Sequence, residues 1–526
     1  MTRWVRAISA RTRGTAETLG GKASGLVLLH RLGLPVPDGF VVIAGACRAF
    51  LRDGRLPAGL DEELAAAVAG LERATGRTFG GPHRPLAVSV RSGAEASMPG
   101  MMSTVLNLGL TTGATEGLAA ETGDRAFALD ARRGLLASFA AATGATTGAG
   151  AAGAAGVAAV AGAVPDDAAQ QLTRAVEAVF ASWEAPRART YRELNGIPHD
   201  RGTAVVVQRM VFGNRDGRSG SGVAFSRDPT TGEDTPFGDV LFGRQGDAVV
   251  SGRTATRPLH DLAEREPQVW SGLLDALHRI EAHHRDACYV EFTFQSGELW
   301  LLQARPGRFA GAAAVRVATE LADQRLIGRD EALLRISPAH LRHVRTPRIA
   351  PTGEADVLVR GTGACPGVAT GRIATTADGA VRTARTGPVV LVRPETSPGD
   401  LHGLAAAAGI VTARGGPASH AAVVARAMGK PAVVGAAGLA VDGTSVTAGG
   451  RTLPEGTLVT VDGTSGEVVL GSPRTVTGAA DVHLHRLLAW ADDASGDHSA
   501  RDEAQRLAAA HAALRGRRAD PRPRPR

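Results

Sequence analysis

The sequence predicts a multidomain α/β protein, and three observations support this. At 526 residues the chain has room for two to four domains of roughly 150 residues each. Segments typical of strands, such as residues 84–94, alternate with segments typical of helices, such as residues 166–194. No apolar run approaches the roughly 18 residues of a membrane span, and the N-terminus lacks the apolar stretch of a signal peptide. We therefore expect a cytoplasmic protein with several cores.

The order of these segments predicts four parts. Residues 1–310 mix strands and helices and contain a Gly/Ala-rich run, 140–163, that we expect to be flexible. Residues 311–350 are typical of a helical linker, and residues 351–475 of short strands and Gly turns around one clear helix. Residues 476–526 begin as a helix and end in a disordered Pro/Arg tail, RRADPRPRPR, which cannot fold by itself.

Charge and cysteine content exclude several classes of protein. Residues 511–526 carry six Arg and one Asp, or +5 of the net charge of +7, so the rest of the chain is close to balanced. We therefore expect no nucleic-acid partner. The cysteines, Cys47, Cys288 and Cys365, are too few and too far apart for a disulfide framework or a Cys-type zinc site.

Lysine is rare in this chain. Of 59 basic residues only Lys22 and Lys430 are lysine. A compact ammonium and a planar guanidinium are not interchangeable, so in a chain so biased towards Arg the two lysines are candidates for roles that Arg cannot fill. Chance retention is the alternative.

The sharpest local pattern is TARGGPASHAAVVARAMGKPAVVG, residues 412–435. It predicts a strand, a Gly-Gly-Pro turn and a helix with Ser419 as N-cap, His420 in the first turn and Gly429 at the end. The free N–H groups and the positive dipole end disfavour a charged imidazole and stabilise a phosphoryl group bound to it. His420 is therefore a candidate nucleophile, with Arg414 as a further phosphate contact. The alternative is a histidine that only caps or packs.

Two weaker patterns place cations where a phosphate can bind. Gly20-Gly21-Lys22 is not a Walker A loop, but a Gly-Gly-Lys turn before a helix can aim an ammonium at a phosphate. A predicted strand ends in Arg91-Ser92-Gly93, which brings an arginine and free amides to a strand end.

The stretch CYVEFTFQSGELWLLQAR predicts a β-hairpin with the three-residue loop Ser296-Gly297-Glu298. This register puts the apolar side chains on one face. On the other face it pairs Glu291 with Gln303, and Tyr289 with Arg305. A two-residue loop would instead place Glu291 opposite Leu302. Carboxylate and amide oxygens beside an arginine suit Mg²⁺ that bridges phosphates, and an ordinary polar sheet face is the alternative.

Together these motifs resemble the pyruvate, phosphate dikinase family, in the family's order up to about residue 492. The matching stretches include GGKASGLVLLHRLGLPVPDGFVV, VSVRSGAEASMPGMMSTVLNLGL, SGSGVAFSRDPTTGE, VEFTFQSGELWLLQARPG and RGGPASHAAVVARAMGKP. The resemblance implies an ATP-grasp nucleotide-binding domain over residues 1–310 and a swivelling β/α phosphohistidine domain over residues 351–475.

The resemblance also implies an activity. In the dikinases a histidine takes the β-phosphoryl group of ATP and leaves AMP, while inorganic phosphate takes the γ-phosphoryl group as pyrophosphate. His420 would be the phosphate carrier. The implied contacts are the phosphate-binding cations Lys22, Arg91 and Arg305 and the nucleotide or Mg²⁺ ligands Glu291 and Gln303.

Four features depart from the family pattern. Tyr289 stands where the family has an acidic residue, which predicts weaker nucleotide or metal binding. Ala418 replaces a threonine that regulatory enzymes phosphorylate, so we expect that control to be absent. The Gly/Ala-rich run replaces a longer helical segment. A phosphoenolpyruvate-binding (β/α)₈ barrel needs about 250 residues, and residue 492 is followed by 34, so we expect the acceptor site on a separate chain.

Three functions fit these features. The first, which we predict, is phosphorylation of His420 by Mg-ATP with transfer to pyruvate or another acceptor held by a separate phosphoenolpyruvate/pyruvate-binding protein. The second is a stand-alone phosphotransferase that acts on a small molecule. The third is a non-catalytic, truncated nucleotide-binding module, which Tyr289 and the Gly/Ala-rich run favour.

Overall fold

The computed structural model divides into two compact units. It describes residues 4–96, 98, 100–144, 164–246, 254, 256–307, 309, 311–350, 356–477 and 481–519. Most of the Gly/Ala-rich run and the last residues of the Pro/Arg tail lie outside these residues. The first unit comprises Met1–Gly220, Phe242–Arg244 and Glu291–Ala304, and the second Ser221–Leu241, Gln245–Val290 and Arg305–Arg526. Among the described residues, no helix combines the length and the apolar character that crossing a bilayer requires.

The first unit is built on an antiparallel five-stranded sheet of order β1-β2-β7-β5-β6. Its strands are β1 (Val5–Ala7), β2 (Gly39–Val42), β5 (Val88–Gly93), β6 (Thr104–Leu108) and β7 (Ala204–Arg209). A short parallel pair, β3 (Thr78–Phe79) and β4 (Pro85–Leu86), lies outside this sheet. The helices are α1 (Ala16–Arg31), α2 (Ala44–Asp53), α3 (Leu60–Thr75), α4 (Thr112–Thr122), α5 (Arg125–Thr143), α7 (Ala168–Ala181) and α8 (Pro186–Leu194).

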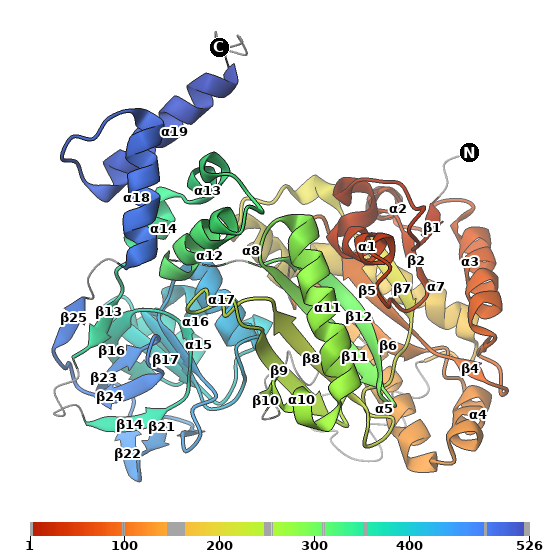
Figure 1. Ribbon diagram of the computed structural model, residues 1–526. Helices are drawn as coiled ribbons and strands as arrows, with labels where there is room; N and C mark the ends of the chain where they lie inside the picture. The colour runs from red at the N-terminus through yellow and green to blue at the C-terminus, as the bar shows by residue number, and fades with distance from the viewer. Residues whose placement is uncertain are drawn as a thin grey trace, which may run out of the picture. The chain divides into compact units, whose positions relative to one another are not determined.

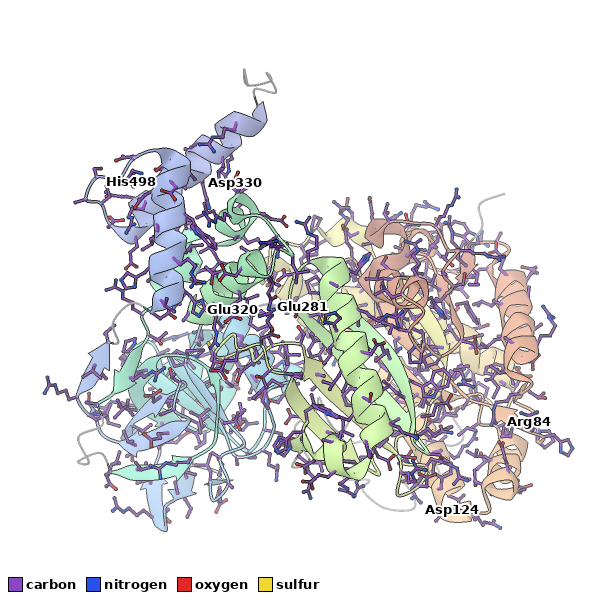
Figure 2. All side chains as sticks on the ribbon, viewed as in Figure 1. Arg84, Asp124, Glu281, Glu320, Asp330 and His498 are labelled. Carbon is purple, nitrogen blue, oxygen red and sulfur yellow. The ribbon has the colours of Figure 1, made fainter. Side chains whose placement is uncertain are left out.

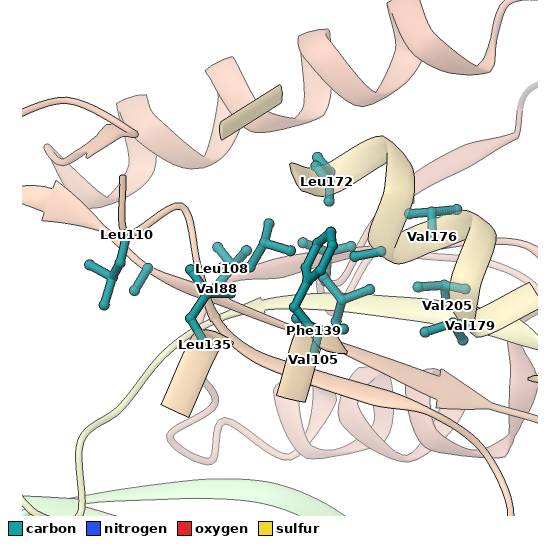
Figure 3. Close-up of a cluster of buried hydrophobic side chains, with 14 of the residues drawn as sticks. Val88, Val105, Leu108, Leu110, Leu135, Phe139, Leu172, Val176, Val179 and Val205 are labelled. Carbon is teal, nitrogen blue, oxygen red and sulfur yellow. The ribbon is translucent and has the colours of Figure 1, made fainter. Parts of the chain in front are cut away.

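Small aliphatic side chains and a few phenylalanines form the core of this unit. Figure 3 shows Phe139 of α5 among valines and leucines from the strands and from α7. Val90, Val105 and Val205 are fully buried. The core therefore joins the sheet to α5 and α7.

A second five-stranded sheet has the order β10-β9-β8-β11-β12. Its strands are β8 (Gly220–Phe225), β9 (Phe237–Phe242), β10 (Arg257–Pro258), β11 (Cys288–Gln295) and β12 (Glu298–Pro306). Two helices, α10 (Asp261–Arg265) and α11 (Pro267–His284), lie between β10 and β11 in the chain.

The hairpin of β11 and β12 turns through two residues, so the predicted three-residue loop is wrong. Ser296 and Gly297 have φ values of 51° and 83°, as a type I′ turn requires, and Glu298 already belongs to β12. The physical reason lies outside the hairpin, because the Ser296 N–H donates to Ser219 Oγ (3.0 Å) and holds the left-handed turn.

The second unit contains an eight-stranded sheet of order β14-β24-β23-β16-β17-β18-β19-β15 (Figure 1). Its strands are β14 (Val357–Arg360), β15 (Thr362–Cys365), β16 (Val368–Ala374), β17 (Val389–Arg393), β18 (Gly409–Thr412), β19 (Ala432–Val434), β23 (Leu458–Asp462) and β24 (Glu467–Leu470). The parallel strands β16 to β19 are connected by α15 (Ala377–Thr383), α16 (Leu401–Ala406) and α17 (His420–Met428). The sequence predicted only α17, because α15 and α16 are too short for a helical period to stand out. A small sheet of β20 (Ala440–Asp442), β21 (Ser445–Ala448) and β22 (Arg451–Pro454) lies between β19 and β23 in the chain.

Five helices of the second unit share one apolar core, and we call them the helical module. They are α12 (Gly311–Asp323), α13 (Arg329–Arg335), α14 (Pro338–Arg342), α18 (Val482–Ser495) and α19 (Glu503–Ala519). The chain leaves the module through β13 (Pro347–Ile349) and returns through β25 (Thr475–Thr477), and these two strands pair antiparallel. Because α19 reaches Ala519, the predicted tail is helical at its start, where Arg517 donates to the Ala494 carbonyl oxygen (2.8 Å).

A buried arginine fixes α12 to the second sheet. Arg227 lies two residues after the end of β8, and its side chain is fully buried. It donates to Glu281 of α11 (2.8 Å) and to Glu320 of α12 (2.9 Å), the two carboxylates labelled in Figure 2. Gln324 accepts a further hydrogen bond (2.9 Å). Loss of one partner in such a buried set costs about 3–5 kcal/mol, so this contact holds α12 firmly.

A glycine breaks α1 where the sequence predicted a turn before a helix. The helix runs through the Gly-Gly-Lys motif, but Gly20 has φ 77° and ψ 155°. A Cβ at Gly20 would overlap the carbonyl oxygen of Gly93 at the end of β5. Gly21 N–H donates to the Ala94 carbonyl oxygen (3.0 Å). The two glycines therefore let α1 touch the strand end, which puts Lys22 beside Gly93.

Gly20→Ala should destabilise the first unit more than Gly54→Ala does. Both glycines have positive φ, but a Cβ at Gly54 has no neighbour within 4 Å. We expect a loss of about 1 kcal/mol for Gly54→Ala from backbone strain alone, and of at least about 3 kcal/mol for Gly20→Ala. Urea unfolding followed by circular dichroism measures both. Equal losses would contradict the close packing of Gly20 on Gly93.

Candidate active site

His420 opens α17, as the sequence predicts. The Ser419 Oγ accepts a hydrogen bond from the Ala422 N–H (3.5 Å) and caps the helix. Gly429 ends the helix with φ 64°. The imidazole therefore lies in the first turn, beside backbone N–H groups that have no partner within the helix.

The His420 ring is held through one nitrogen. Nδ1 lies 3.1 Å from Thr396 Oγ1, and Nε2 is buried without a hydrogen-bond partner among the described residues. Burial lowers the pKa of His420 to about 4, and the Asp400 carboxylate partly opposes this. The ring is therefore neutral near pH 7. With the proton on Nδ1, shared with Thr396, Nε2 keeps the lone pair that a nucleophile needs.

Two arginines flank the loop before His420. Arg414, a candidate phosphate contact in the sequence, is paired with Glu395 (Nε–Oε2 2.9 Å). Arg426 of α17 was not predicted. It donates to the carbonyl oxygens of Pro417 (2.6 Å) and Ala364 (3.2 Å), and burial lowers its pKa to about 10. Arg426 therefore holds the loop before His420 through its hydrogen bond to Pro417.

The loop from Gly415 to Ala418 rests on Asp239 of β9, a residue that sequence reasoning missed. The Ala418 N–H donates to the Asp239 carboxylate, and a Cβ at Gly416 would overlap the same group. Thr256 Oγ1 donates to it as well (2.9 Å). Burial raises the pKa of Asp239 to about 6, while these hydrogen bonds oppose the shift. No motif surrounds Asp239 in the sequence, so only the tertiary contact reveals it.

In the first unit the structure brings together four of the predicted site residues. Lys22 lies beside the end of β5, the strand that carries Arg91. Burial lowers the pKa of the Arg91 guanidinium and the nearby Glu291 carboxylate raises it. One turn after Lys22, a Cβ on Gly25 would lie 2.8 Å from the Ala304 carbonyl oxygen, next to Gln303 on β12. Cations and oxygen ligands thus lie around the end of β5 in the first sheet.

Arg305 lies in the second unit, over the ring of Tyr289, with Cζ 4.4 Å from the ring centroid. This is the pair expected from the three-residue loop, although the turn has two residues. The pattern of buried residues along β12 accounts for this pairing. Leu299 and Leu301 are buried two positions apart, but the next buried residue is Ala304, three positions after Leu301. Such a change of phase is typical of a β-bulge, which shifts the register by one residue.

No group of three or more His, Cys, Asp or Glu side chains within the described ranges is arranged to hold a metal ion. Glu291 and Gln303 offer carboxylate and amide oxygens. Mg²⁺ is commonly bound by one or two such ligands together with substrate phosphates. The residues present therefore fit a metal that arrives with a nucleotide.

Two family profiles match the chain. "Pyruvate phosphate dikinase, AMP/ATP-binding domain" matches residues 53–258, and "PEP-utilising enzyme, mobile domain" matches residues 386–466. The first range contains Arg91 and Asp239, and the second contains His420. A pyruvate, phosphate dikinase of Rhizobium meliloti is 38% identical over 563 residues, which cover 98% of this chain and 63% of the relative. The chain belongs to the pyruvate, phosphate dikinase family.

Two other members of the dikinase family give the same result. Pyruvate, phosphate dikinase 2 of Zea mays is 39% identical over 91% of this chain and 58% of the relative. A pyruvate, phosphate dikinase of Clostridium symbiosum is 37% identical over 94% of this chain and 60% of the relative. The chain thus spans about 60% of the length of these curated relatives.

The second lysine of this dikinase-family chain has a structural role. Lys430 Nζ donates to the carbonyl oxygens of Ala405 (2.7 Å) and Ala407, at the end of α16. Burial lowers the pKa of Lys430. A compact ammonium that reaches two carbonyl oxygens explains why lysine is found here.

The His420 imidazole should stay neutral well below the usual range of histidine. A histidine in an unfolded chain titrates near pH 6.5, and His420 in the folded chain near 4. Because the folded pKa is the lower one, the stability contributed by the neutral ring is complete above about pH 6.5 and is lost as the pH falls towards 4. NMR titration of the imidazole C–H resonances, with the His420→Asn variant for assignment, measures this pKa. A midpoint near 6.5 would contradict the buried ring.

Proposed function

We propose that this chain uses ATP to phosphorylate His420 on Nε2. One observation carries the proposal: a neutral imidazole, oriented through Nδ1 by Thr396, lies in the first turn of α17, and none of the residues that the structure describes bonds to its Nε2. The Nε2 lone pair would form a bond to the β-phosphorus of ATP while the bond from that phosphorus to the AMP oxygen breaks. Inorganic phosphate would then take the γ-phosphoryl group as pyrophosphate, which leaves one phosphoryl group on Nε2. No general base is needed, because Nε2 carries no proton. The helix N-terminus would stabilise the phosphoryl charge that results.

The substrates we propose are ATP and inorganic phosphate, with AMP and pyrophosphate as products. Lys22, Arg91 and Arg305 would contact the phosphates. Glu291 and Gln303 would hold Mg²⁺, which when bound neutralises part of the triphosphate charge. The cluster around the end of β5 supports the roles of Lys22, Arg91, Glu291 and Gln303, because these cations and oxygen ligands lie in one unit. Arg305 belongs to the second unit.

The division of labour we propose follows the predicted domains. Residues 1–310 act as the ATP-grasp nucleotide-binding domain, residues 311–350 as a linker and residues 351–475 as the phosphate-carrying domain. The carried phosphoryl group would pass to pyruvate or another acceptor, bound by another chain or segment. The names of the curated relatives support pyruvate as the first acceptor to test.

His420→Asn should abolish phosphorylation and keep the fold, since Asn is tolerated at helix starts. The measurement is acid-labile label on the protein after incubation with β-³²P-ATP, with and without phosphate. His402→Asn is the matched control, because His402 lies on α16 and pairs with Asp378 (2.9 Å). Label on His420→Asn equal to that on His402→Asn would overturn the proposal.

Lys22→Ala and Lys430→Ala should have opposite effects. Lys22→Ala should slow phosphorylation roughly 100-fold, as loss of a charge-stabilising donor does, and change the free energy of unfolding by about 0–1 kcal/mol. Lys430→Ala should keep most activity and lose about 1.5–3 kcal/mol of stability, because two carbonyls lose a charged donor. Label incorporation and urea unfolding measure the two effects. A stability loss confined to Lys22→Ala would reverse the two roles.

A further inference from the structure

A buried cluster lies under the loop that precedes His420. Tyr289 of β11 is 3% exposed and belongs to this cluster. Its other members are Val223, Phe225, Leu241 and Ala418. Ala418 comes from the loop and the rest from strands β8, β9 and β11. The residue two positions before the proposed phosphate carrier is therefore packed into the second sheet.

The Tyr289 ring is fixed from two sides. The Phe225 ring meets it edge-on, with centroids 4.9 Å apart and an interplanar angle of 62°. The Arg305 guanidinium lies over it at 4.4 Å. Edge-to-face aromatic pairs and cation–π contacts are both favourable and both directional. The ring is thus a rigid element of the sheet surface.

The loop is tied to the same surface by two further contacts. Ala418 donates its N–H to Asp239, and the Arg426 guanidinium of α17 lies 5.6 Å from the centroid of the Phe225 ring. The strands that supply these groups, β9, β8, β11 and β12, are neighbours in the sheet. We call Phe225, Asp239, Tyr289 and Arg305 the loop seat.

We propose that Tyr289 is a positioning residue: its ring forms the floor of the loop seat for Ala418 and so fixes where His420 is presented for phosphoryl transfer. The inference deepens the proposed function and rests on it. It gives Tyr289 a different role from weak nucleotide or metal binding, because the ring is covered by Phe225, Arg305 and the loop. It also gives a reason for the small residue at 418, since a larger, hydroxyl-bearing side chain would have to be buried among apolar and aromatic groups.

Hydrogen exchange of the loop amides tests the seat without ATP. In Tyr289→Leu the exchange of residues 415–420, measured by mass spectrometry on the full chain, should rise about tenfold. Tyr289→Phe, which keeps the ring, should stay within about threefold of the wild type. Tyr191→Leu, at the other tyrosine of the chain, is the matched control and should leave the loop unchanged. Equal exchange in Tyr289→Leu and wild type, or an equal rise in Tyr191→Leu, would overturn the proposal.

Ala418→Thr probes the same contact from the loop side and serves if Tyr289→Leu folds poorly. Alone it should also raise loop exchange about tenfold. The double variant should exchange about as fast as either single one, because a seat that is already lost cannot be lost again. A hundredfold, additive rise in the double variant would show that the two residues act independently, which contradicts a shared seat.

Kinetics separate positioning from nucleotide binding. In Tyr289→Leu the rate of His420 labelling at saturating ATP should fall at least tenfold, while the ATP concentration for half-maximal rate stays within about twofold. A rise in that concentration with an unchanged maximal rate would assign Tyr289 to nucleotide binding instead. If the wild type is not labelled at all, the proposed function fails, and the exchange experiment still decides whether the seat exists.

Discussion

The close approach of the Gly415-Gly416 backbone to Asp239 determines how His420 is presented. A Cβ at Gly416 would overlap the Asp239 carboxylate, and Ala418 donates its N–H to the same group. These contacts hold the loop as it enters α17, where Ser419 is the N-cap and the imidazole lies beside Thr396. The contact with Asp239 thus holds the loop that leads into α17, while the local cap residues place His420 at the helix N-terminus and burial keeps its ring neutral.

The first unit depends on a constraint of the same kind. Gly20 and Gly21 bring α1 against the end of β5, so that an ammonium on the helix and a guanidinium on the strand face the same region. In both units glycine is needed for close contact and not for flexibility: Gly20 packs against the backbone of Gly93, and Gly416 against the carboxylate of Asp239. Such contacts fix the position of the side chains that follow the glycines, and a phosphate site requires side chains in fixed positions.

The sequence allowed correct predictions where the interactions join residues that are close together in the chain. The caps of α17 could be predicted because Ser419, His420 and Gly429 lie within one short segment. The hairpin turn was mispredicted because the left-handed Ser296 depends on Ser219, which is remote in the chain. Asp239 could not be predicted, since its contact with the loop exists only after folding. Tyr289 was interpreted through the negative charge that it lacks, whereas in the structure its ring packs against Phe225 and Arg305.

The paired strands β13 and β25 carry the chain out of the helical module and back into it. Any reorientation of the eight-stranded sheet must therefore be shared by both strands. Arg227 holds α12 in place at one end of this connection, and Asp462 accepts the Ile349 N–H at the other (2.9 Å). Two-stranded ribbons twist more than wide sheets do, while their hydrogen bonds oppose separation. A rotation of the His420-bearing sheet about the ribbon axis would twist both strands and leave their cross-strand hydrogen bonds in place, whereas a translation of the sheet would have to break them.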